Sequence, residues 1–240
     1  MMSDVVTPGT LYGIGLGPGD PELLTLKGYR ILQSVPIVAY PKSPDGRCIS
    51  RGIVADYLKA DQIEIGMDFP FRLEESSQPK YDYWAGVLAK HLKAGQDIAV
   101  LCEGDPFFFG TFMYLFNRLS PDFPVEIIPG VSSVMASAGM LRAPLTYRND
   151  VFKVLMGTLP TETLIEQLKT ADAAVIMKLG RNFAKARMVL EEVGLVDRAL
   201  FIERATTKEQ RIIPIKEVDP GRVPYFSMIV IPSAWKWAEG

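Results

Sequence analysis

Short apolar runs alternate with stretches of helical periodicity through the first half of the chain. Strands are predicted where a short, mostly apolar run is bounded by glycine, proline or polar residues. The predicted strands are 10–17, 36–41, 62–67, 97–106 (ending in a Gly-Asp-Pro turn) and 125–130, and the predicted helices are 20–35, 48–60, 80–94 and 131–142. Asp20 is expected to cap the first helix, with Pro21 in its first turn. Strands separated by helices in this way predict a parallel, doubly wound sheet.

The second half of the chain has a different pattern, with fewer helices between its apolar runs. The predicted strands are 151–157, 173–180, 199–205, 211–218 and 225–234, and the predicted helices are 161–169 and 182–193. This order favours a mixed sheet in a second domain. We therefore expect an N-terminal α/β domain over 1–129 and a C-terminal α/β domain over 130–240, with the join between 120 and 150.

Composition places the chain among ordinary globular proteins. Of its 240 residues, 48% are apolar and 22% are charged. The formal net charge of −2 argues against a general nucleic-acid binder, which would show a basic face. The chain holds no apolar run of the roughly 18 residues that span a bilayer, and its start does not resemble a secretory signal. We expect a cytoplasmic protein that binds neither nucleic acid nor membrane.

The supply of cysteine and histidine limits the possible chemistry. Cys48 and Cys102 lie far apart and are expected to be free thiols in a reducing compartment. His91 is the only histidine, and it lies in a predicted amphipathic helix closed by Gly95, where a surface position is expected. A Ser-His-Asp triad or a histidine-rich zinc site would depend on this residue alone, so neither is predicted, and no metal site is expected.

The stretch "GIGLGPGDPELLT" (13–25) contains four glycines in its first seven positions. It fails the dinucleotide pattern G-x-G-x-x-G in every frame and lacks the phosphate-binding G-x-x-x-x-G-K-[ST]. By itself it is compatible with a tight structural turn or with a backbone that approaches a ligand. Three more such turns follow predicted strands: "EGDPFFFG" (103–110), "PGVSS" (129–133) and "LGRN" (179–182). Turns gathered at strand ends predict a cleft in which main-chain atoms hold the ligand.

Three of these motifs carry a resemblance to a known family. In their order and spacing, "GLGPGDPELLTLKG", "EGDPFFFG" and "EIIPGVSS" resemble the tetrapyrrole (corrin/porphyrin) methyltransferases of cobalamin and siroheme synthesis. The resemblance covers essentially the whole chain. It implies the two-domain α/β fold of that family, with an N-terminal parallel sheet, a C-terminal mixed sheet and an active site in the cleft between them. It also implies S-adenosylmethionine as cofactor, a tetrapyrrole substrate and a homodimer.

Two longer stretches, "AYPKSPDGRCISRGI" (39–53) and "LCEGDPFFFGTFMYLFNRL" (101–119), resemble the members that methylate C20 of precorrin-2 or of cobalt-factor II. Glu103 stands where a uroporphyrinogen III methyltransferase would be expected to have glycine, which argues against that alternative. A nicotinamide-dependent oxidoreductase is the alternative from another class, and the broken dinucleotide pattern argues against it. A relative that binds the cofactor without transferring methyl is a third.

The resemblance also implies site residues. The positions expected to bind the cofactor are Pro18, Glu103, Gly104, Asp105, Phe108, Ser132 and Ser133, with Leu179 and Ala205 in the second domain. No catalytic residue is assigned. For Asp105, capping of its own glycine-containing turn is the alternative. Most of the aromatic run from Phe107 to Phe116 is expected to face the core, and only Phe108 and its neighbours by the turn are expected to line the adenosine pocket.

A tetrapyrrole carries carboxylates on its rim, and arginine binds carboxylates with two parallel hydrogen bonds. Lys42, Arg47 and Arg51 are the basic residues expected to bind them, since they lie in or beside the extended segment 39–53. Arg142, Arg148 and Arg181 lie near later turns and are further candidates. For each of them, an ordinary solvated surface charge is the alternative.

Overall fold

The computed structural model describes residues 6–43, 46–69 and 77–234. Two residues of the extended segment 39–53, residues 44 and 45, therefore lie outside the described part. The chain divides into two compact units, Met1–Ser132 and Ser133–Gly240, called unit 1 and unit 2 below. The domain division expected after residue 129 stays a prediction.

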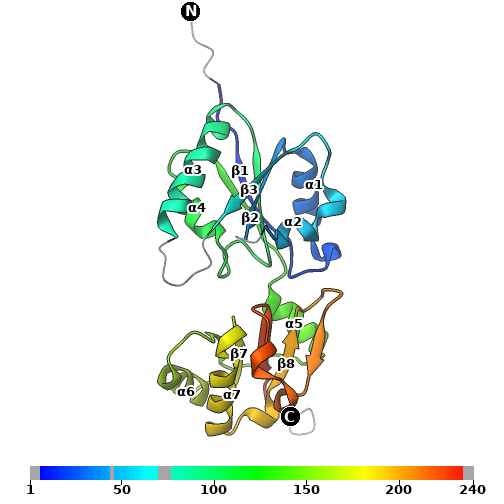
Figure 1. Cartoon of the computed structure of the whole chain (residues 1–240), viewed down its shortest axis with the longest axis vertical. Helices are drawn as coiled ribbons and strands as arrows, with labels where there is room; N and C mark the ends of the chain where they lie inside the picture. The colour runs from blue at the N-terminus through cyan, green and yellow to red at the C-terminus, as the bar shows by residue number, and fades with distance from the viewer. Residues whose placement is uncertain (1–5, 44–45, 70–76, 235–240) are drawn as a thin grey trace, which may run out of the picture. The chain divides into compact units, whose positions relative to one another are not determined.

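Unit 1 is built on a five-stranded sheet in which every pairing is parallel (Figure 1). Its strands are β1 (Leu11–Gly15), β2 (Ile37–Lys42), β3 (Ile63–Asp68), β4 (Ile98–Cys102) and β5 (Val125–Ile128). Their order across the sheet is β3-β2-β4-β1-β5. Because all five run the same way, their carboxyl ends meet at one edge. The predicted parallel sheet is confirmed, with each strand near its expected place.

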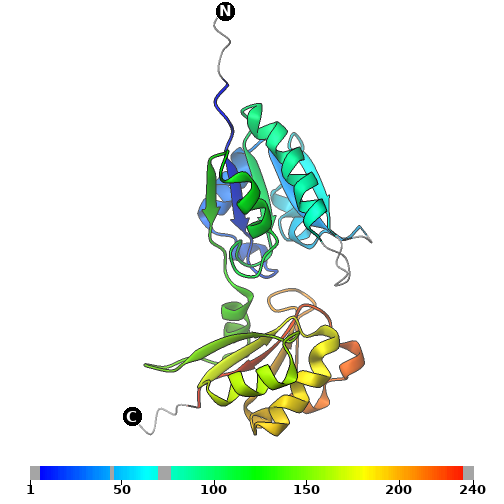
Figure 2. The same cartoon turned by 90° about the vertical axis from the view of Figure 1, so that its left-hand side faces the viewer.

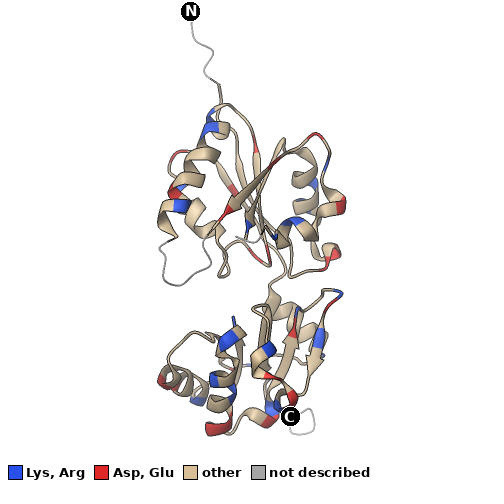
Figure 3. Cartoon of the chain, viewed as in Figure 1, with Lys and Arg blue, Asp and Glu red and all other residues tan. Residues whose placement is uncertain are grey.

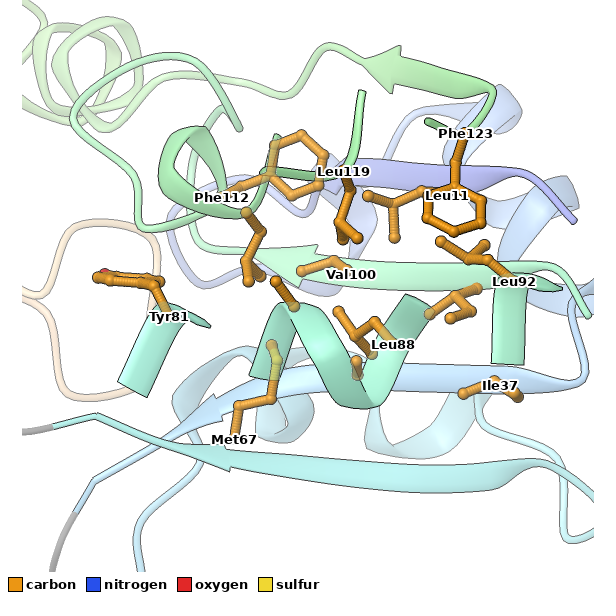
Figure 4. Close-up of a cluster of buried hydrophobic side chains, with 14 of the residues drawn as sticks. Leu11, Ile37, Met67, Tyr81, Leu88, Leu92, Val100, Phe112, Leu119 and Phe123 are labelled. Atoms are coloured by element: carbon orange, nitrogen blue, oxygen red, sulfur yellow. The ribbon is translucent and has the colours of Figure 1, made fainter. Parts of the chain in front are cut away.

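Helices cover both faces of this sheet. They are α1 (Leu26–Ser34), α2 (Ile49–Ile53), α3 (Gln78–Lys93) and α4 (Phe112–Leu119). In Figure 1, α3 and α4 lie on one face and α1 and α2 on the other. Figure 4 shows the core under α3 and α4, where Leu88 and Leu92 pack with Val100 of β4 and Phe112 of α4. Burial on both faces explains why the inner strands β1, β2 and β4 are mostly apolar.

The single helix predicted over 20–35 is wrong. A short 3₁₀ helix, η1 (Pro21–Leu23), ends at Leu23, and α1 begins after Thr25, so Leu24 and Thr25 separate the two. Asp20 caps η1 as predicted, because its carboxylate accepts a hydrogen bond from the Glu22 amide at 2.9 Å. The Thr25 hydroxyl caps α1 by accepting from the Gly28 amide at 3.1 Å. A threonine that can cap favours a new helix start over helix continuation.

The predicted helix 48–60 is also divided. It contains α2 and a short 3₁₀ helix, η2 (Ala55–Tyr57), separated by Val54.

Unit 2 contains the predicted mixed sheet. Its strands are β6 (Phe152–Met156), β7 (Ala173–Met177), β8 (Leu200–Glu203), β9 (Arg211–Ile213) and β10 (Ser227–Ile231), in the order β6-β7-β10-β8-β9. β6 and β7 are parallel, whereas β10 runs antiparallel to both of its neighbours, β7 and β8. The strand predicted over 211–218 ends early, because Pro214 lacks an N–H to donate and a 3₁₀ turn follows.

The helices of unit 2 are α5 (Ser133–Leu141), α6 (Thr161–Lys169) and α7 (Phe183–Glu192). Figure 2 shows α6 and α7 on the same side of the sheet, where Leu164 and Phe183 are fully buried in a common core. Figure 3 shows basic and acidic segments interspersed on the helices of each unit. Within the described ranges, no helix combines the length and apolar character needed to cross a bilayer.

Candidate functional site

Two glycine-rich turns of unit 1 are joined by their main chains where β1 and β4 end. Gly104 donates its amide to the Gly17 carbonyl at 2.8 Å, and Gly17 donates to the Gly104 carbonyl at 3.2 Å. β1 and β4 are neighbours in the sheet, so the turn after each strand meets the other directly. Pro18, Gly104 and Asp105, all predicted to bind the cofactor, are thereby brought to the same sheet edge.

The turn after β5 packs against both of these turns. A Cβ atom on Gly15 would lie 2.5 Å from the Gly130 nitrogen, and one on Gly130 would lie 2.1 Å from the Gly104 carbonyl oxygen. Real Cβ atoms do not approach backbone this closely, so glycine is required at both positions for contact between turns. For Gly15, the structural role that was the alternative for the stretch 13–25 therefore applies, and Gly130 has the same role in the turn after β5. The effect is a rigid edge made of main chain.

Asp105 links the second turn to the third. One carboxylate oxygen accepts a hydrogen bond from the Phe107 amide at 2.9 Å, which caps the Asp105 turn itself. The other accepts from the Gly130 amide at 3.0 Å, across 25 positions of sequence. Turn capping was the alternative for this residue, and the structure adds the second bond. Asp105 can therefore affect ligand binding by holding the two turns in position.

The Glu103 side chain points to α2. Its carboxylate accepts a hydrogen bond from the amide of Ser50, a fully buried residue, at 3.0 Å. Although part of Glu103 reaches the surface, its carboxyl group is desolvated, and this burial raises the pKa of Glu103 above its ordinary value. The bond ties the segment that carries Arg47 and Arg51 to the end of β4.

Replacing Glu103 by glutamine is expected to stabilise the protein at neutral and alkaline pH. Glutamine keeps an oxygen that can accept from Ser50 but carries no charge to desolvate. With its folded-state pKa raised above the ordinary 4.5, the wild-type carboxyl group favours folding below that ordinary value. That contribution is lost as pH rises through the folded-state pKa. Thermal unfolding should show a higher midpoint for Glu103→Gln at about pH 8 and no difference at about pH 4; equal midpoints at the higher pH would contradict the assignment.

The aromatic run after Asp105 faces the core less than predicted. Phe112 is fully buried, but Phe107, Phe109 and Tyr114 are exposed. The core prediction is wrong for Tyr114, which lies on α4 with its ring against Tyr81 but stays exposed. Phe107 and Phe109 lie in the turn before α4, beside Phe108, where lining of the cofactor pocket is the expectation. Phe108 is half-buried, with its ring edge-to-face against Phe109 at 4.8 Å.

The remaining predicted cofactor residues are divided between the units. Ser132 is the last residue of unit 1, two positions beyond Gly130, and Ser133 begins α5 in unit 2. Leu179 follows β7 and is fully buried, with its side chain in the core of unit 2. Ala205 is half-buried in the turn after β8.

Two basic residues beside Leu179 and Ala205, neither of which the sequence predicts as a site residue, have an unusual backbone conformation. Lys178 has φ +54° and Arg204 has φ +46°, in the left-handed region that non-glycine residues rarely adopt. Each such residue costs on the order of 1–3 kcal/mol, and strain of this kind is concentrated at functional sites. Desolvation lowers the pKa of Lys178. The sequence gives no signal for such a conformation, because lysine and arginine do not normally adopt it.

The three predicted substrate-binding residues lie in different environments. Lys42 at the end of β2 and Arg47 are exposed. Arg51 instead binds Glu64 with two hydrogen bonds, of 2.5 and 2.9 Å, and Tyr40 donates to the same carboxylate at 2.9 Å. Arg51 holds the pKa of Glu64 below its usual range. A substrate carboxylate would have to compete with Glu64 for Arg51.

His91, Cys48 and Cys102 are residues for which no catalytic or metal-binding role is predicted. His91 is half-buried near the end of α3, where its Nδ1 lies 2.8 Å from the Gln96 amide oxygen. Cys48 and Cys102 are free thiols. No three His, Cys, Asp or Glu side chains of the described ranges are grouped so that they could hold a metal ion.

Comparison with known proteins identifies relatives along most of the chain. Residues 10–219 match the family model of the tetrapyrrole (corrin/porphyrin) methylases. The chain is 42% identical to a cobalamin biosynthesis protein CobIJ of Mycobacterium tuberculosis, over 93% of this chain but 46% of that protein. It thus spans about half the length of that relative. It is 38% identical to a precorrin-2 C(20)-methyltransferase of a Sinorhizobium species, over 95% of this chain and 96% of the relative. Among solved structures, uroporphyrin-III C-methyltransferase of Thermus thermophilus, complexed with S-adenosylhomocysteine, is 28% identical, with a TM-score of 0.68 and coverage of 92% and 97% of the two chains.

Proposed function

The chain belongs to the tetrapyrrole (corrin/porphyrin) methylases, and we propose that within this family it transfers a methyl group from S-adenosylmethionine to C20 of precorrin-2 or of its cobalt-containing counterpart. The reaction would serve cobalamin biosynthesis. The observation that carries this proposal is the 38% identity to a precorrin-2 C(20)-methyltransferase along nearly the full length of both chains. A cobalt-precorrin-2 C(20)-methyltransferase of Salmonella typhimurium is 32% identical over 96% of this chain.

The edge of the unit 1 sheet suits this cofactor. S-adenosylmethionine has a cationic sulfonium and an uncharged adenosine, and it has no phosphate. The turns 13–19, 103–110 and 129–133 contain neither lysine nor arginine, but they do contain Glu103 and Asp105. Main-chain groups held rigidly by the contacts among Gly15, Gly104 and Gly130 could bind such a ligand without phosphate-type recognition. Pro18, Gly104, Asp105, Phe108 and Ser132 are the residues of unit 1 proposed to hold it, with Glu103 supporting them from the side of α2. Ser133, Leu179 and Ala205 are those proposed in unit 2.

When bound, S-adenosylmethionine supplies an electrophilic methyl group on sulfur. The bridging carbons of a reduced tetrapyrrole are nucleophilic, so the protein's main task is to hold the reacting atoms in line. Such alignment can lower a barrier by roughly 7–11 kcal/mol. The turns of unit 1 would orient the cofactor, while Lys42 and Arg47 would hold rim carboxylates of the substrate.

We also propose that the protein acts in the cytoplasm as a homodimer and that the two units are its two domains. Two free thiols are typical of a reducing compartment. Sedimentation of the purified protein would test the dimer.

One experiment tests the activity. The purified protein is incubated with methyl-labelled S-adenosylmethionine and either precorrin-2 or its cobalt form, and the label is located by NMR. Label at C20 supports the proposal, and the better substrate shows which macrocycle is preferred. Label at another carbon would favour another tetrapyrrole methylase, such as a uroporphyrinogen III methyltransferase. In a thermal-shift assay, stabilisation by NAD and not by S-adenosylhomocysteine would favour the oxidoreductase alternative instead.

Replacing Arg47 is expected to weaken substrate binding more than replacing Arg51. Arg47 is exposed, whereas the guanidinium of Arg51 is already bound to Glu64. Removing one charge-assisted contact should lower tetrapyrrole affinity about tenfold in Arg47→Ala. Titration of both variants with the tetrapyrrole measures this, with affinity for S-adenosylhomocysteine as the control. Unchanged binding in both variants would remove this segment from the substrate site.

A further inference from the structure

Two cations and two aromatic residues meet at one end of the central strands of unit 2. The strand order places β10 between β7 and β8. Lys178 directly follows β7, Arg204 directly follows β8, and Tyr225 and Phe226 directly precede β10. The Arg204 amide donates to the Phe226 carbonyl at 2.8 Å, which fixes their adjacency. Neighbouring strands are about 4.8 Å apart, so the main chains of Lys178 and Arg204 lie about 10 Å apart, on either side of the strand that the aromatic pair precedes.

The aromatic pair is exposed although it is apolar. The exposed fractions of Tyr225 and Phe226 are 57% and 45%. Their rings contact each other edge-to-face, with centroids 5.1 Å apart and an interplanar angle of 87°. The core of unit 2 is formed by other residues, so the fold gains little from aromatic side chains at these two positions. Exposed aromatic groups of this kind are typical of ligand-binding surfaces.

The two cations occupy positions where the fold alone would favour glycine. Both have positive φ, a conformation that glycine adopts without steric cost. The acidic residue next to Arg204, Glu203, forms its ion pair with Arg211 instead, at 3.6 Å. No acidic side chain of the described ranges forms an ion pair with Arg204. A charged side chain at a strained position where glycine would fit without cost points to a role outside folding.

We propose that Lys178, Arg204, Tyr225 and Phe226 form a tetrapyrrole-binding patch on unit 2, in which the rings contact the apolar macrocycle and the cations bind carboxylates of its rim. A tetrapyrrole offers both features, an extended apolar face and a border of anionic groups. Simple anions would use the cations and leave the rings exposed, so they explain only half of the patch. The inference rests on the proposed function and names further substrate contacts for it.

The test measures binding of uroporphyrin III, a stable tetrapyrrole with carboxylates on its rim, to protein saturated with S-adenosylhomocysteine. Lys178→Met, Arg204→Met and Phe226→Ala are each expected to weaken porphyrin binding about tenfold. Affinity for S-adenosylhomocysteine, measured by calorimetry, should remain that of the wild type. Lys169→Met, at an exposed position at the end of α6, is the matched control and should leave both affinities unchanged.

Lys178→Gly separates binding from folding. It removes the cation and relieves the positive φ, so its thermal midpoint should not fall below that of the wild type, while porphyrin binding weakens as in Lys178→Met. Wild-type porphyrin affinity in both Lys178 variants and in Arg204→Met would overturn the patch and leave the proposed function standing. A wild-type protein that binds no S-adenosylhomocysteine would instead overturn the proposed function, and the patch with it.

Discussion

Gly130→Ala is expected to destabilise unit 1 by about 3 kcal/mol or more, at the upper end of the range for overpacked sites. The new Cβ would lie 2.1 Å from the Gly104 carbonyl oxygen and 2.7 Å from the Gly15 carbonyl carbon. Both contacts are with backbone, so no side-chain rotation relieves them, and the three turns must separate. The variant should also lose affinity for S-adenosylhomocysteine. Urea unfolding and calorimetry measure the two effects.

Gly86→Ala is the matched control for this substitution. Gly86 lies in α3 of the same unit, and a Cβ there would meet nothing within 4 Å. Alanine in a helix interior should stabilise the protein by about 0.5–1 kcal/mol relative to glycine. If Gly130→Ala were as stable as Gly86→Ala, the close packing of the turns would be wrong.

Asp105→Ala is expected to abolish detectable cofactor binding, with a loss of about a hundredfold or more, while the protein stays folded. The substitution removes the acceptors of the Phe107 and Gly130 amides, and each hydrogen bond to a charged group contributes about 1.5–3 kcal/mol. The main-chain bridge between Gly17 and Gly104 remains, so the turns lose their alignment without losing the sheet. Calorimetry with S-adenosylhomocysteine measures the affinity, and circular dichroism reports the fold.

Asp219→Ala provides the comparison for Asp105. Asp219 also accepts a hydrogen bond from the amide two residues further along, that of Gly221, at 2.9 Å. It lies in unit 2, however, and its ion pair is with nearby Arg222. Its removal should leave cofactor affinity unchanged. Wild-type affinity in Asp105→Ala would exclude Asp105 from the cofactor site.

The sheets of both units could be predicted from the sequence, because a buried strand produces a compact apolar run wherever it occurs. The break between Leu24 and Thr25 could not, since the residues on both sides are compatible with one continuous helix. The glycine motifs could be recognised in the sequence, but the sequence did not show that their glycines pack against one another. Gly15, Gly104 and Gly130 acquire their meaning only when strands distant in the sequence become neighbours.

Among the site residues, too, some features could be predicted from the sequence and others could not. Arg51 stays a predicted substrate contact, but the sequence does not show that Glu64, thirteen positions further along, binds its guanidinium. The positive φ of Lys178 and Arg204 could not be predicted, because sequence periodicity carries no information on it. Their significance comes from β10, which follows both in the chain and lies between the strands they end.

The interlocked glycines also constrain how this protein could be engineered. A chimaera that takes only one of the three turns from a paralogue would contain a loop whose shape does not match the other two turns. Its atoms would clash at Gly15 or Gly130. Loop exchange aimed at new regiochemistry should therefore transplant the turns after β1, β4 and β5 together, as a single cassette.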